Sequence, residues 1–168
     1  LSIMSREAQG LKRDLKESLK WLDLAMENAG FDFGPKVYSD HTIIKYLLDE
    51  GVPPDFDPED IKAKAKSGDA RAQYHLALVY ETGVGFPQNL PSSSRWFQEA
   101  AKKEVAGAQF KMGVYYHSGG PGIEPDHRKA FEITFTAAKH GNLSAKYNLG
   151  IFYQDGIGVT RNPQKAIK

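Results

Sequence analysis

One sequence pattern occurs three times between residues 69 and 168, and it restricts the possible folds of this chain more than any other feature. The segments 69–80, 105–116 and 142–153 agree position by position. Equivalent alanines and tyrosines are offset by 36 and then 37 residues: Ala72, Ala108 and Ala145, and Tyr80, Tyr116 and Tyr153. A fixed period in this range is typical of stacked supersecondary units rather than of one closed core.

Each copy predicts a helix, a turn and a second helix. Ala72, Leu76 and Tyr80 recur at steps of four, which places three apolar groups on one helical face. Glycines follow in every copy, at positions where a turn favours a residue without a side chain. The next polar residue occupies the place of an N-cap for the second helix: Asn89, Asp126 and Asn162.

The pattern resembles the Sel1-like repeat, a relative of the tetratricopeptide repeat. The third copy is the nearest to that motif, with the segment 145–159 reading AKYNLGIFYQDGIGV. The resemblance covers residues 65–168 and implies an all-α fold, a right-handed α-solenoid of stacked antiparallel helix pairs. We place the solenoid at 57–168, with units at about 69–103, 105–140 and 142–168, the last one incomplete.

Some residues depart from this motif or precede it. Ala77 stands where the motif has glycine, which we expect to widen the helix spacing in the first unit. Ser93 stands where the other copies have alanine. The short stretch Ala63 to Gly68 aligns with the ends of the later second helices, so we interpret it as the tail of an incomplete preceding unit.

Residues 1–56 predict an N-terminal helical extension and a linker. Apolar residues at alternating steps of three and four predict an amphipathic helix from Ile3 to Ala29. It would pack on the end of the stack, or else serve as a coiled-coil or partner-docking helix. Gly34-Pro35 indicates a loop over 31–38, and a second helix is expected over 42–50. Asp57 followed by Pro58 predicts the start of the next helix.

Composition excludes several classes of partner and site. Twenty-two basic and 21 acidic residues give a net charge of +1 without a long block of either sign, which argues against a nucleic-acid partner. The chain has no cysteine, so disulfides and thiolate metal sites are absent. No apolar run is long enough to insert into a membrane. We expect a cytoplasmic protein, with a lumenal compartment left open, and a piece of something longer.

No group of residues predicts catalysis, a metal or a cofactor. The five histidines show no metal-ligand spacing, and the serine run 92–94 has no base beside it. The acids around Asp55 do not follow the spacing of a calcium loop, so we interpret them as a helix cap and a solvated first turn. The sequence therefore favours a non-catalytic protein. The alternative is an accessory segment of a larger enzyme, a kinase or a hydrolase, that positions the enzyme or its substrate.

The remaining candidate is a surface. In helix-pair solenoids the first helices line a concave groove, and residues outside the packing face point into it. The predicted stripe comprises His75, Leu78, Thr82, Lys111, Val114, Ser118, Asn148, Ile151 and Asp155. An apolar floor with polar rims suits a peptide or helix from a partner protein. The alternative is that Leu78, Val114 and Ile151 pack against the second helix of the preceding unit.

The sequence thus predicts an adaptor or scaffold with a protein or peptide partner. The first helix of the last unit, from Asn142 to Asp155, lacks most of its second helix and is expected to expose an apolar flank. We therefore also expect self-association, either through this incomplete unit or through the N-terminal helix.

Overall fold

The computed structural model describes residues 15–27 and 34–166, and every regular element within these ranges is a helix. They are α2 (Leu15–Glu27), α3 (Gly34–Asp49), α4 (Pro58–Lys66), α5 (Ala70–Thr82), α6 (Leu90–Lys102), α7 (Ala106–Ser118), α8 (His127–Lys139), α9 (Leu143–Asp155) and α10 (Pro163–Ala166). The described part of the chain is therefore all-α, as predicted.

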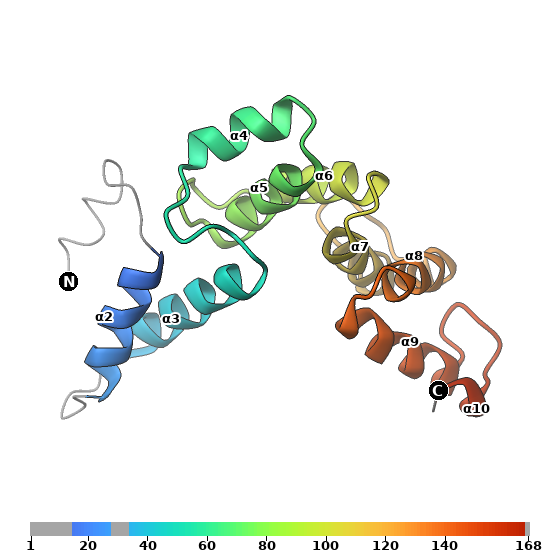
Figure 1. Ribbon diagram of the computed structural model, residues 1–168. Helices are drawn as coiled ribbons and strands as arrows, with labels where there is room; N and C mark the ends of the chain where they lie inside the picture. Colours follow the sequence, from blue (N-terminus) through green and yellow to red (C-terminus); the bar gives the residue numbers. More distant parts are fainter. Residues whose placement is uncertain (1–14, 28–33, 167–168) are drawn as a thin grey trace.

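Figure 1 shows the helices following one another along an arc. Helices α5, α7 and α9 lie on its inner side, and α4, α6 and α8 lie on its outer side. Each inner helix and the outer helix after it form an antiparallel pair, the first and second helix of one repeat unit. This is the stacked helix-pair architecture that the period of the sequence predicts.

Local sequence explains where the helices start and stop. Asp69 and Asn142 cap α5 and α9, because each side chain accepts a hydrogen bond from the backbone three residues on. The predicted caps Asn89 and Asp126 do the same for α6 and α8. Helix α5 ends at Gly83, which adopts φ 79°, a conformation that costs glycine little.

Small residues bring the two helices of a unit together. Gly113 on α7 faces Thr134 on α8 so closely that a Cβ at position 113 would lie 2.3 Å from the threonine Oγ1. Ala77 holds the equivalent place on α5 and is fully buried. Larger side chains, among them Leu76, Phe97 and Met112, fill the remaining core between successive units.

The start of the repeat region agrees with the sequence. Asp57 caps α4 through the backbone N–H of Glu59, and Pro58 occupies the first turn, as predicted. Helix α4 packs against α5. Gln73 on α5 also donates a hydrogen bond to the carbonyl oxygen of Ala65 at 3.1 Å, so α4 takes the place of a preceding second helix.

The prediction for α3 was wrong at its start. The helix begins at Gly34, so residues 34–38 are helical rather than a loop. Pro35 lies in the first turn, where a proline is tolerated because the backbone N–H groups there have no partner within the helix. Helix α2 accounts for residues 15–27 of the predicted amphipathic helix, and the rest of that prediction lies outside the described residues.

Candidate partner-binding surface

The α5 part of the predicted stripe is mostly closed to solvent. His75 and Leu78 on α5 are buried, with Leu78 wholly enclosed in the core. Thr82 donates a hydrogen bond from its hydroxyl to the carbonyl oxygen of Leu78 at 2.9 Å, within its own helix. Leu78 therefore packs inside the protein and does not form the floor of an open groove.

The end of α3 lies against the inner helices α5 and α7. The Tyr46 hydroxyl is 3.4 Å from a carboxylate oxygen of Glu81 on α5. The ring of Tyr46 lies 5.2 Å from the Nζ of Lys111 on α7. Just after the end of α3, Glu50 accepts a hydrogen bond from the Tyr74 hydroxyl. The N-terminal part of the chain thus occupies this section of the inner side.

Lys111 is engaged within the protein. Its Nζ is 3.0 Å from both carboxylate oxygens of Glu81 and also lies 5.8 Å from the centre of the Phe97 ring. Tyr115 adds a hydrogen bond to the same carboxylate at 3.3 Å. Burial and the charge of Glu81 raise the pKa of Tyr115 to about 12, and the same causes raise the pKa of Tyr46. Both tyrosines therefore remain hydrogen-bond donors near neutral pH.

The open part of the stripe lies on α7 and α9. Val114 and Ile151 are half-buried, whereas Ser118 and Asp155 are exposed. Asn148 is half-buried, like Val114 and Ile151. This section has the predicted composition of apolar positions with polar neighbours. It carries little charge, so a partner would be recognised by shape and hydrogen bonds more than by long-range electrostatics.

The sequence did not predict the contacts of Glu81 and Tyr46. Glu81 occupies a position that differs in every copy, with His117 and Gln154 as its equivalents. That variation was a signal that the position serves something other than the common fold. Its partner Lys111 lies 30 residues away, and no local pattern links the two.

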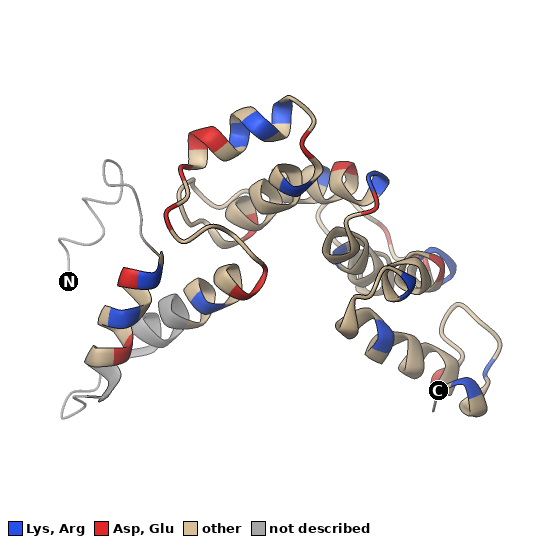
Figure 2. Ribbon diagram, viewed as in Figure 1, with Lys and Arg blue, Asp and Glu red and all other residues tan. Residues whose placement is uncertain are grey.

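None of the described residues form a group of three or more His, Cys, Asp or Glu side chains that could hold a metal ion. Figure 2 shows basic and acidic residues on the same helices. Helix α4, for example, carries acids in its first turn and lysines in its last. A hollow of about 380 Å³ lies along α2 and is lined by Lys16, Leu19, Lys20, Asp23 and Leu24.

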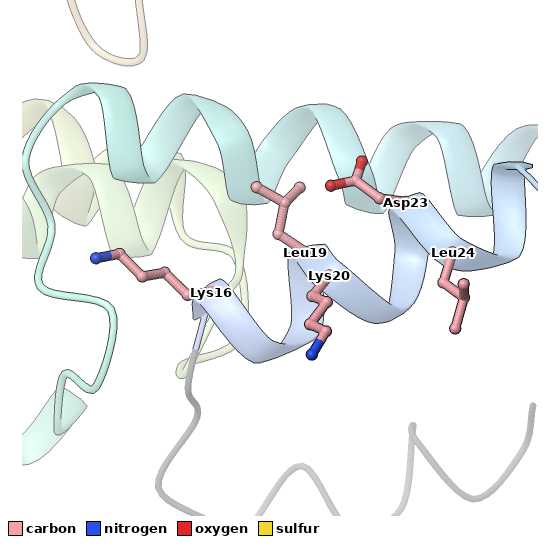
Figure 3. A pocket seen from close by; sticks show the side chains of 5 residues that line it. All are labelled: Lys16, Leu19, Lys20, Asp23 and Leu24. Carbon is pink, nitrogen blue, oxygen red and sulfur yellow. The ribbon is translucent and has the colours of Figure 1, made fainter.

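Figure 3 shows how these side chains lie along α2. Leu19 points toward the neighbouring helix, and Lys20 and Leu24 point away from it. The hollow therefore follows the outside of a single helix and brings no reactive groups together. Among the described helices, none is both long enough and apolar enough to cross a bilayer.

Comparison with known proteins places these features in a family. The family model for the Sel1 repeat matches residues 1–29, 70–105, 106–142 and 143–168. The match to 1–29 includes α2, which lies in the segment predicted only as a helical extension.

Two curated relatives carry the name chitin synthase regulator SKT5. The one from Malassezia restricta is 30% identical over 165 residues, which cover 94% of this chain and 11% of that protein. The one from Saccharomyces cerevisiae is 31% identical over 168 residues, covering 95% and 24%. The chain thus spans a quarter or less of the length of these relatives.

Solved structures agree with the fold. A Sel1 repeat protein from Oxalobacter formigenes is 36% identical with a TM-score of 0.59, covering 64% of this chain and 80% of that one. A protective antigen of uropathogenic Escherichia coli with an SLR fold is 26% identical with a TM-score of 0.61, covering 88% and 31%. From its repeats and its helix-pair architecture, the chain belongs to the Sel1 repeat family.

Proposed function

We propose that the chain is a non-catalytic adaptor that holds a peptide or helix of a partner protein on the inner faces of α7 and α9. The observation that carries this proposal is the open section of the stripe, where Val114 and Ile151 lie among Ser118, Asn148 and Asp155. Partly exposed apolar groups with polar neighbours are typical of protein-binding surfaces. They lie on rigid helices, which lowers the entropic cost of ordering the surface on binding.

The names of the relatives suggest where such an adaptor acts. Both SKT5 proteins are named regulators of chitin synthase. We therefore propose that this chain takes part in regulating chitin synthase and does so by contact with another protein. The section of the inner side on α5 is occupied by α3, so the proposed surface begins at α7.

A capture experiment tests this proposal. The immobilised chain is incubated with a detergent extract of yeast cells, and the bound proteins, chitin synthases among them, are quantified by mass spectrometry. The test variant combines two substitutions. Val114→Glu places a charge at an apolar position, and Asp155→Lys reverses the charge of an exposed residue. We expect it to recover chitin synthase or its associated proteins at least tenfold less than the unchanged chain.

The control variant changes the outer side of the arc. Arg128→Glu with Glu132→Lys on α8 exchanges two exposed charges and keeps an oppositely charged pair. We expect this variant to bind as the unchanged chain does. Circular dichroism checks that both variants retain their helices. Equal recovery with all three proteins would show that the inner surface is not the binding site.

A further inference from the structure

Two histidines of the second repeat unit lie side by side although they come from different helices. His117 is in the last turn of α7, and His127 is the first residue of α8. Their ring centroids are 5.3 Å apart, and the ring planes are inclined by 38° to each other. His127 is exposed, so solvent has access to this histidine pair.

The histidine pair is specific to the second unit. The other units carry different residues at both positions: Glu81, Gln154, Leu90 and Pro163. The common helix-pair fold therefore does not require histidine at either position. Both positions are histidine in the same unit, and the fold places the two side chains in contact.

The third unit fixes both histidines from the other side. The ring centroid of His117 lies 5.4 Å from that of Phe152 on α9. The turn after α9 lies against the backbone of His127, because a Cβ at Gly158 would be 1.9 Å from the His127 carbonyl oxygen. The Nδ1 of His117 is buried and has no hydrogen-bond partner among the described residues. Packing thus holds the pair in place, while one ring nitrogen has no partner in the protein.

The spacing of the two rings fits two ligands of one metal ion. Neutral imidazole is the commonest side-chain ligand of metals in proteins and suits Zn²⁺ and Cu²⁺ in particular. With a metal–nitrogen bond of about 2.1 Å, two imidazoles on one ion have centroids roughly 5 Å apart. The separation of 5.3 Å therefore allows both rings to reach one ion with little movement.

We propose that His117 and His127 bind one divalent transition-metal ion of the zinc or copper type. No third His, Cys, Asp or Glu ligand joins them among the described residues, so water completes the coordination and the ion can exchange. The bound ion connects the end of α7 to the start of α8. It thereby stabilises the turn between the two helices of this unit, since binding to a folded site stabilises the fold.

Titration calorimetry of the intact chain with zinc chloride tests this site. We expect one ion bound per chain. His117→Gln and His127→Leu introduce the residues that α9 and α6 carry at the same positions, which the helix-pair fold accommodates. Each should raise the dissociation constant at least tenfold. His140→Asn, at another exposed histidine, is the matched control and should bind as the unchanged chain does.

Two results of this titration would overturn the proposal. One is the absence of zinc binding to the unchanged chain. The other is equal affinity in all four proteins, which would indicate an adventitious ion only. Thermal unfolding provides a second measurement, because a ligand that binds only the folded state raises the melting temperature. Excess zinc should raise it in the unchanged chain and in His140→Asn, and should raise it less in the two test variants.

Electron paramagnetic resonance with one equivalent of Cu²⁺ identifies the coordinating atoms. The hyperfine couplings of bound nitrogen are expected to show two imidazole ligands in the unchanged chain. His127→Leu should reduce them to one, because only His117 remains. A spectrum that His127→Leu leaves unaltered would contradict the assignment of the site to this pair.

Discussion

Lys111 on α7 places its ammonium nitrogen 3.0 Å from each carboxylate oxygen of Glu81 on α5, so one ion pair joins two successive repeats. The two side chains are only 21% and 20% exposed. Tyr46 of α3 and Tyr115 of α7 donate hydrogen bonds to the same carboxylate. The carboxylate of Glu81 therefore links three helices that are far apart in sequence.

Removing the lysine should destabilise the stack. In Lys111→Met the apolar part of the side chain is retained, but Glu81 remains half-buried with only neutral donors. We expect the free energy of unfolding to fall by about 2 kcal/mol, since a partly buried charge has lost its counter-ion. Urea denaturation followed by circular dichroism measures the loss.

An exposed pair provides the control for this prediction. Arg128 and Glu132 on α8 form an ion pair whose side chains are 85% and 61% exposed. Arg128→Met should change the free energy of unfolding by less than about 0.5 kcal/mol, because water already solvates both charges. Equal losses in the two variants would mean that burial does not strengthen the Glu81–Lys111 pair.

The period and the caps were sufficient to predict the repeat helices. Asp69, Asn89, Asp126 and Asn142 all cap helices, because N-capping depends on a local contact within one turn. Gly34-Pro35 misled the prediction of α3, since the same dipeptide is compatible with a loop and with the first turn of a helix. Local sequence does not decide between the two, and packing does.

The candidate surface could be predicted only in part. Helical geometry places Val114, Ser118 and Asp155 at the surface, where the structure has them partly or fully exposed. It could not show that α3 lies beside α5, because that arrangement depends on contacts such as Tyr46 with Glu81, 35 residues apart. The positions that differ among the repeats carried this information, but their partners could not be identified without the fold.

The contact between Gly113 and Thr134 predicts a sharp steric effect. A Cβ at position 113 would lie 2.3 Å from the Thr134 Oγ1, which is closer than real atoms approach. Gly113→Ala should therefore lower the free energy of unfolding by about 1–3 kcal/mol, although alanine is the better helix former. Chemical denaturation of the purified variant measures this change.

A second substitution identifies the cause. Thr134→Ala removes the clashing oxygen, and the next nearest atoms, the Ile133 Cγ2 and the Thr134 Cβ, lie 3.4 and 3.5 Å away. The double variant should be more stable than Gly113→Ala alone, whereas Thr134→Ala by itself should destabilise the protein by opening a small cavity. Purely additive losses would show that the two residues do not interact.

His75 predicts a dependence of stability on pH. Burial, assisted by the positive charge of Arg71, lowers the pKa of this histidine to about 4, and its Nε2 is buried without a hydrogen-bond partner among the described residues. In the unfolded chain the pKa is about 6.5, so the unfolded state takes up the proton first as the pH falls. The free energy of unfolding should therefore decrease as the pH falls from about 6.5 toward 4.

His75→Asn removes this titration and takes the residue found at the equivalent position of α9, Asn148. Between pH 7 and pH 5 the unchanged chain should lose about 1 kcal/mol more than the variant, a figure reduced from the full shift to allow for solvent screening. Urea denaturation at both pH values measures the difference, and comparison with the variant cancels the contributions of the carboxylates. If the free energy of unfolding fell equally with pH in the two proteins, the pKa of His75 would not be lowered in the folded state.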